Sequence, residues 1–157
     1  MLIGISFSGC EKDDICDETT PTTPKVVIEF YDAVATTTLK NITNLKITAT
    51  GFTSELKYNA ESKIKVPLKT FADVAALNFT LNGSVDPTTD DNQDEVIFNY
   101  TRKTAYVSRA CGFKTIYTLD ATNPVSVTTD GNNWIQNITV SQPNIENENE
   151  THVKIYF

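Results

Sequence analysis

The chain has 157 residues, a length typical of a single domain that can bury its own core. Its formal net charge is −7 and no stretch is strongly basic, which argues against nucleic acid as a partner. Hydrophobic residues make up 39% of the chain, a share that excludes wholesale disorder. No run approaches the roughly 20 apolar residues of a membrane-spanning helix, so we expect any membrane attachment to use a lipid.

Residues 1–10 form a short apolar run that ends in small residues before a cysteine. The ending Ser8-Gly9-Cys10 resembles the lipobox of bacterial lipoproteins, in which such a cysteine is acylated and becomes the mature N-terminus. This resemblance implies that residues 1–9 are the remnant of a lipoprotein signal peptide and that Cys10 is the lipidation site. A plain N-terminal strand is the alternative interpretation of the same run.

An acidic tract and a Pro/Thr-rich segment follow Cys10. The tract at 11–14, Glu-Lys-Asp-Asp, resembles the signal for surface display of lipoproteins in Bacteroidota, with a solvated acidic linker as the alternative. The segment at 17–24 is expected to be extended and to have no core of its own. Residues 10–24 are therefore predicted to form a lipidated tether.

From residue 25 onward, apolar and polar residues alternate with the period of half-buried β-strands. Pro67 cannot donate a ladder hydrogen bond, so its strand is expected at a sheet edge. Asp130-Gly131 predicts a hairpin between residues 125–129 and 134–140. Residues 25–157 are predicted to form one all-β domain, an antiparallel β-sandwich of about eight to ten short strands. The alternation is clearest at 26–30, 45–49, 63–69, 77–82, 96–100, 116–118, 138–140 and 153–157.

Five segments carry a resemblance to a known group of proteins. They are residues 10–16, 23–32, 100–107, 108–118 and 147–157, and they resemble the uncharacterised lipoproteins of flavobacteria and related Bacteroidota. The resemblance spans nearly the whole chain. It implies export and lipidation, and hence an outer-membrane lipoprotein on the periplasmic or the surface side. That family has no assigned activity, so the resemblance implies no mechanism.

The remaining cysteines form an even pair once Cys10 is assigned to the lipid. Export would place Cys16 and Cys111 in an oxidising compartment, where disulfides form and persist. We therefore predict a disulfide between Cys16 and Cys111, with two free thiols as the alternative.

One acidic loop has the spacing of a calcium site. Asp90, Asn92 and Asp94 match the opening D-x-N-x-D of a calcium-binding loop, whose oxygens can converge on a hard cation. The match ends there, because Glu95 stands where the turn glycine belongs and Thr101 where the bidentate glutamate belongs. A solvated hairpin tip is the alternative interpretation, and no cofactor is expected.

Two further residues bear on function. His152, the only histidine, is opposite in phase to Val153 in the predicted last strand, so we expect it to be exposed and not catalytic. Trp134 follows a predicted turn, so it is the aromatic residue expected to be exposed and able to stack on a sugar. No catalytic motif is present, and we expect no enzymatic activity. The sequence predicts a cell-envelope lipoprotein, anchored in the membrane by its lipid, that binds or scaffolds an unknown envelope protein or glycan. A surface glycan-binding module is the alternative.

Overall fold

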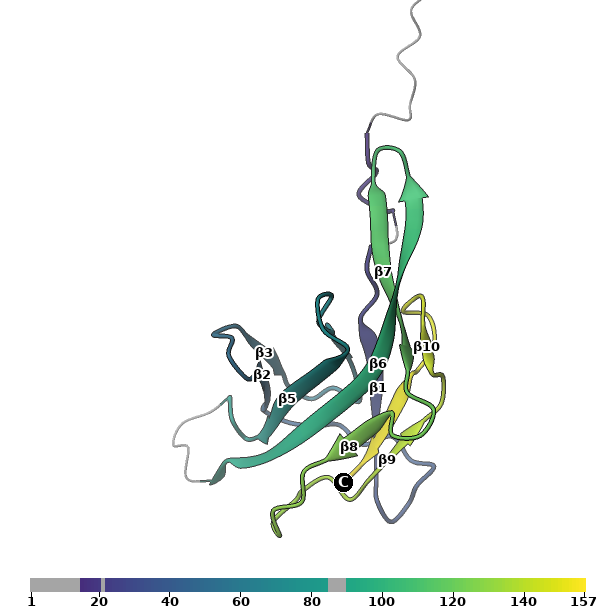
Figure 1. Ribbon diagram of the computed structural model, residues 1–157. Coiled ribbons are helices and arrows are strands. Elements are labelled where there is room, and N and C mark those ends of the chain that lie inside the picture. Colours follow the sequence, from purple (N-terminus) through teal and green to yellow (C-terminus); the bar gives the residue numbers. More distant parts are fainter. Residues whose placement is uncertain (1–14, 21, 85–89) are drawn as a thin grey trace, which may run out of the picture.

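The computed structural model describes residues 15–20, 22–84 and 90–157, and within these ranges the chain forms eleven strands in two sheets (Figure 1). The described residues contain no helix that is long and apolar enough to cross a membrane. The predicted all-β sandwich is confirmed. The predicted lipidation site, Cys10, lies outside the described residues.

The two sheets differ in size. The smaller has four strands in the order β4-β1-β11-β9, and the larger follows the path β10-β7-β6-β5-β2-β3, with β8 paired to β6. The strands are β1 (Val26–Tyr31), β2 (Leu45–Ala49), β3 (Glu55–Tyr58), β4 (Lys63–Val66), β5 (Val74–Leu81), β6 (Asn92–Ser108), β7 (Gly112–Leu119), β8 (Val125–Val127), β9 (Asn137–Val140), β10 (Asn144–Ile145) and β11 (Val153–Tyr156).

The inner faces of the two sheets form one core. Val26, Ile28 and Phe30 of the small sheet are fully buried, and so are Phe79 and Phe98 of the large sheet. Burying each such side chain contributes about 1.5–3 kcal/mol relative to leaving it in water. The alternation seen in the sequence therefore identifies the inward faces of most strands; in β7 the predicted phase, with Ile116 and Thr118 inward, is wrong, because Tyr117 and Leu119 are the buried residues.

One strand pair departs from the antiparallel pattern. β11 pairs with β1 in parallel, with Ile28 opposite Val153 and Phe30 opposite Ile155. Parallel neighbours cannot be joined by a tight turn. Here they come from the two ends of the domain, so the rest of the fold provides the connection.

The expected edge strand is present. β4 lies at the edge of the small sheet and ends at Val66, directly before Pro67. The predicted hairpin at Asp130-Gly131, however, is wrong. β8 pairs with β6 in the large sheet while β9 pairs with β11 in the small one, so this turn carries the chain from one sheet to the other.

A two-stranded ribbon projects from the sandwich (Figure 1). β6 is 17 residues long, and the part from Tyr100 to Ser108 pairs with β7. At the ribbon tip Cys111 forms a disulfide with Cys16, 95 residues away in sequence. The predicted disulfide is confirmed, and such bonds are typical of extracytoplasmic proteins.

Candidate functional site

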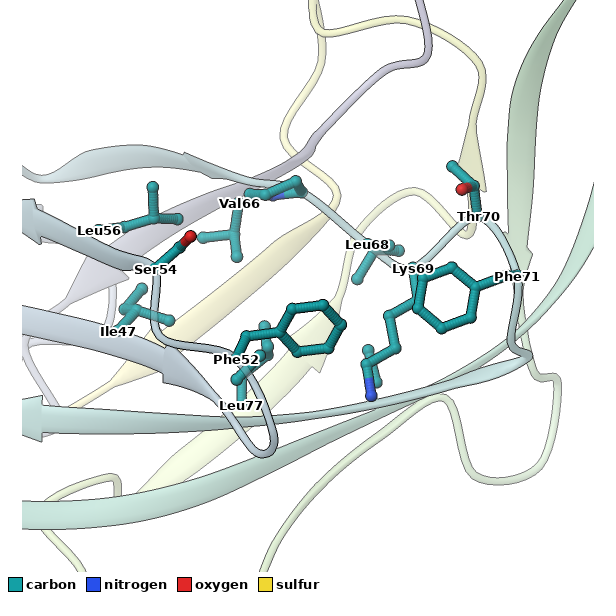
Figure 2. A pocket seen from close by; sticks show the side chains of 13 residues that line it. Ile47, Phe52, Ser54, Leu56, Val66, Leu68, Lys69, Thr70, Phe71 and Leu77 are labelled. Carbon is teal, nitrogen blue, oxygen red and sulfur yellow. The ribbon is translucent and has the colours of Figure 1, made fainter.

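An open apolar groove of about 280 Å³ is the clearest candidate site (Figure 2). One side is formed by β2, β3 and β5, which contribute Ile47, Leu56 and Leu77. The other side is the segment that follows β4, here called the groove wall and defined as residues 67–73. The volume lies just below the usual range for ligand pockets, roughly 300–1,000 Å³.

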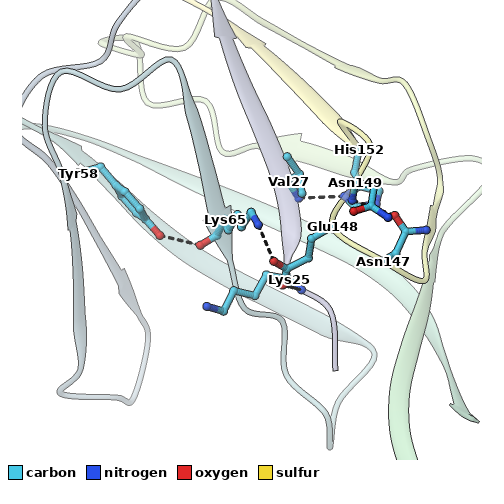
Figure 3. Close-up of polar contacts among 8 residues, drawn as sticks. All are labelled: Lys25, Val27, Tyr58, Lys65, Asn147, Glu148, Asn149 and His152. Atoms are coloured by element: carbon cyan, nitrogen blue, oxygen red, sulfur yellow. Dashed lines mark hydrogen bonds and ion pairs between the residues drawn. The ribbon is translucent and has the colours of Figure 1, made fainter. Parts of the chain in front are cut away.

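The groove lies where the sandwich opens at one side. β3 is the last strand of the large sheet and β4 the last of the small one, so neither has a further strand to cover the gap. A single hydrogen bond joins these two edges, from the hydroxyl of Tyr58 to the carbonyl of Lys65 at 2.6 Å (Figure 3). Beside it the groove opens to solvent at Phe52 and Phe71, while Ile47, Val66 and Leu77 beneath them are buried.

Two exposed aromatic rings stand at the groove. Phe52 and Phe71 are 50% and 68% exposed, and their ring centroids lie 6.4 Å apart. Figure 2 shows the two rings beside each other, with Lys69 close to Phe71. Single exposed apolar residues are common, but an exposed pair over an apolar hollow is typical of a binding surface.

Tyrosine hydroxyls hold the groove wall in place. Tyr117 donates to the carbonyl of Leu68 at 3.3 Å, and Tyr100 donates to the carbonyl of Lys69 at 3.0 Å. The two rings pack edge to face with centroids 5.2 Å apart. Burial raises the pKa of Tyr100 to about 12, so its hydroxyl stays protonated and able to donate.

Arg102 holds the next residue of the groove wall, Thr70, in the same manner. Its Nη1 donates to the carbonyl of Thr70 at 2.7 Å, and its Nε donates to the carboxylate of Asp73 at 2.6 Å. Three successive carbonyls of the groove wall are thus held by side chains of β6 and β7. The groove is therefore already formed before any ligand binds.

The groove carries one cation. Lys69 is the single charged residue in the lining, and its Nζ lies 5.7 Å from the ring centroid of Phe52. Within the part of the chain that the structure describes, Lys69 makes no salt bridge. An apolar hollow with a positive charge at its rim complements a molecule that has an apolar body and an anionic end.

The groove and the ribbon both lie within a region shared with known sequences. Residues 44–157 match DUF6452, a family of unknown function. The chain belongs to the DUF6452 family. No curated protein and no solved structure matches it significantly. The DUF6452 match covers β2 to β11, and thus every strand except β1.

The two exposed aromatic residues of the groove in this DUF6452 protein were missed by the sequence patterns. Phe52 follows Gly51 in a turn, and Phe71 lies in the segment between β4 and β5, so neither belongs to an alternating strand. A signal did exist, because large apolar residues in segments expected to be loops have no core to enter and remain exposed.

The calcium-like residues have separate surroundings. Asp94 is buried and accepts a hydrogen bond from the N–H of Ile135 at 2.8 Å, while Asn92 donates to the carbonyl of Asn132 at 2.9 Å. Asp90 is exposed. Burial raises the pKa of Asp94. Among the described residues no group of three His, Cys, Asp or Glu side chains could hold a metal ion.

Trp134 belongs to the core. Its ring is 8% exposed, its Nε1 donates to the carbonyl of Phe79 at 3.1 Å, and it packs edge to face on Phe157. The expectation that Trp134 is exposed is wrong, because the preceding turn crosses between sheets and leads the chain into the interior. The ring offers no open face for a sugar.

His152 is also buried, with 1% of its surface exposed. Its Nδ1 accepts a hydrogen bond from the N–H of Val27 at 2.9 Å (Figure 3). The N–H of Ser141 donates to the His152 carbonyl from the other side. Burial lowers the pKa of His152, and the nearby Glu150 and Glu148 oppose that shift. The expectation of an exposed histidine is wrong, because backbone from both sides covers it.

Proposed function

We propose that this protein is an exported, lipid-anchored binding protein of the cell envelope that acts without catalysis. The groove carries the proposal for binding, and its ligand is an amphiphile with an apolar body and an anionic end, such as a fatty acid. The lipobox-like sequence at Cys10 and the disulfide support export and anchoring. Placement at the outer membrane, on the periplasmic or the surface side, rests on the resemblance to flavobacterial lipoproteins.

The energetics of the groove favour an apolar ligand. Covering Phe52 and Phe71 removes apolar surface from water, which stabilises the complex by roughly 25 cal/mol for each Å². The groove wall is held by hydrogen bonds in the free protein, so little ordering is needed on binding. Lys69 adds selectivity for a negative end, since its charge is otherwise unpaired among the described residues.

The lining of the groove supports binding rather than chemistry. Besides Lys69, its polar side chains are the hydroxyls of Ser54 and Thr70. The described residues that line the hollow include no carboxylate, imidazole or thiol, and Asp73 of the groove wall is paired with Arg102 outside this lining. Acid–base or nucleophilic catalysis would need paired titrating groups within reach of each other. The alternative function, a surface glycan-binding module, is less well supported, because Trp134, the residue expected to stack on a sugar, is buried.

Ligand binding can be tested with the full chain carrying Cys10→Ala, which cannot be acylated. The protein is loaded with a fluorescent fatty acid, and the affinity for laurate is measured from its displacement of this probe. The Phe52→Ser/Phe71→Ser variant should bind laurate at least tenfold more weakly than the wild type. The matched control is Phe113→Ser, because Phe113 is as exposed as Phe71 at 68% but lies on the ribbon. Equal affinity in the groove and control variants would refute the groove as the site.

Charge selectivity gives a second readout at the same site. Lys69→Glu should weaken laurate binding and strengthen binding of dodecyltrimethylammonium, because the apolar contacts remain while the charge at the rim is reversed. If the variant keeps the wild-type preference for laurate, Lys69 has no role in recognition.

The anchor is tested separately in the native host. The mature protein should have the mass of a chain that begins at Cys10 plus its acyl groups, and Cys10→Ala should abolish both processing and membrane association. A protein that retains Met1 and lacks acyl groups would contradict the proposed anchor without affecting the groove.

A further inference from the structure

The tip of the β6–β7 ribbon exposes a cluster of apolar side chains. Tyr106 and Phe113 are opposite each other across the two strands, with ring centroids 5.4 Å apart, and they are 63% and 68% exposed. Ile15 is 82% exposed and lines the same hollow as Tyr106, next to Arg109. We call Ile15, Tyr106 and Phe113 the tip cluster.

The polarity of β6 changes along the ribbon. Residues 101–104, Thr-Arg-Lys-Thr, are exposed and polar, as expected of a strand surrounded by water. Only beyond them does the tip cluster begin. A ribbon with polar residues at 101–104 and aromatic residues at its tip is suited to a position in which the strands are in water and only the tip enters a less polar environment.

The disulfide fixes which end of the domain faces the anchor. Cys16 is bonded to Cys111 at the ribbon tip, with their Cα atoms 4.9 Å apart, and Figure 1 shows the described residues 15–20 beside this tip. Cys10 lies six residue steps before Cys16, which spans at most about 20 Å even when fully extended. An acylated Cys10 would therefore keep this tip within about 20 Å of the bilayer.

We propose that the tip cluster is a second membrane contact, which enters the boundary between headgroups and acyl chains of the bilayer that holds the lipid anchor. This inference rests on the anchor proposed above. Tyrosine rings favour that boundary because the hydroxyl stays hydrated while the ring leaves water. Arg109 at the tip can pair with lipid phosphates. The contact orients the domain so that the ribbon stands on the membrane and the sandwich is held away from it.

The contact can be measured with two matched indole reporters in the acylated full-length protein. Phe113→Trp places an indole in the tip cluster, and Val34→Trp places one in the loop after β1, outside the groove and beside the C-terminal Phe157; the two positions are 68% and 95% exposed. Each protein is reconstituted into phosphatidylcholine vesicles whose acyl chains carry bromine, a contact quencher. Wild-type protein provides the baseline, because Trp134 is buried.

We expect the Phe113→Trp indole to lose most of its added emission in brominated vesicles, and the Val34→Trp indole to keep its emission. If the protein floats with the vesicles but the Phe113→Trp indole is not quenched, the anchor stands and the tip contact is refuted. Such a result would leave the tip cluster free for a protein partner. If the acylated protein does not float with the vesicles, the anchor itself fails and this inference fails with it.

The cluster itself is tested by removing its rings. In a Tyr106→Ser/Phe113→Ser variant the acylated protein should still float with vesicles, yet a protease that cannot enter the bilayer should cleave the chain at Arg109 several-fold faster than in the wild type. Lys57, which is exposed on β3 away from the ribbon, provides the internal control site. Equal cleavage at Arg109 in both proteins would contradict a buried tip.

Discussion

The buried histidine makes the stability of this domain depend on pH in a way that can be calculated. His152 Nδ1 accepts the N–H of Val27 at 2.9 Å, which is possible only while that nitrogen carries no proton. Burial lowers the pKa of His152 in the folded protein. In the unfolded chain the same side chain titrates near its ordinary pKa of 6.5. Acid therefore favours the unfolded state.

The sign and size of this pH dependence of the free energy of unfolding follow from proton linkage. Above pH 6.5 both states hold a neutral imidazole, so His152 adds no pH dependence. Between 6.5 and the lower pKa of the folded state, the unfolded chain binds one proton more than the native one. The free energy of unfolding then falls as pH decreases, by at most about 1.4 kcal/mol per pH unit. Glu148 and Glu150 oppose the shift and so shorten this interval at its acid end.

Urea unfolding at several values between pH 7.5 and 5 measures this effect. The matched control is His152→Asn, whose side-chain oxygen can accept the Val27 N–H but does not titrate. The wild type should become less stable between pH 6.5 and 5.5, by at most about 1 kcal/mol, whereas the variant should not. Asp94 has a pKa raised by burial and shifts stability in the opposite direction, but it titrates in both proteins and cancels in the difference.

A third variant separates titration from the hydrogen bond itself. His152→Leu leaves the buried Val27 N–H without an acceptor, which costs about 1–3 kcal/mol at every pH. Parallel pH profiles for the wild type and His152→Asn would refute the assignment of a neutral, buried His152.

The remaining predictions concern the disulfide and the groove wall. Replacing Cys16 and Cys111 by serine opens a loop of 95 residues, and chain entropy predicts that the free energy of unfolding falls by up to about 4–5 kcal/mol. The urea midpoint should fall accordingly. A reducing agent should destabilise the wild type but not the variant. Tyr100→Phe removes the donor to the Lys69 carbonyl and should weaken laurate binding several-fold. Tyr31→Phe, which loses a surface hydroxyl on the other sheet, should leave that affinity unchanged.

The strands were predictable because their inner faces alternate in the sequence. Val96, Phe98 and Tyr100 are all buried, as their period of two requires. The pairing of the strands, in contrast, could not be predicted from this alternation. Nothing in β11 itself indicates that it inserts beside β1 in parallel, since that choice depends on how the whole chain closes. The burial of His152 follows from this insertion and could not be foreseen.

The disulfide could be predicted from the sequence, whereas the groove could not. Pairing Cys16 with Cys111 followed from the number of cysteines once one was assigned to the lipid. The groove depends on contacts between distant segments, because Arg102 reaches back 32 residues to the carbonyl of Thr70. No local pattern contains such a contact. Trp134 was misjudged for a related reason, since turn chemistry does not say whether the next strand joins the same sheet.

The ribbon connects the two proposed sites. Tyr100 and Arg102 at its base hold the groove wall, and Tyr106, on the same face of the strand, belongs to the tip cluster. Six residues of strand separate Tyr100 from Tyr106, which corresponds to about 20 Å at 3.3–3.4 Å per residue. Adding two residues to each strand would raise the groove by about 7 Å and keep the faces, whereas adding one would turn the tip residues to the opposite face. In the proposed arrangement, the register of this ribbon would therefore determine both how far the groove stands from the membrane and which side chains meet the lipid.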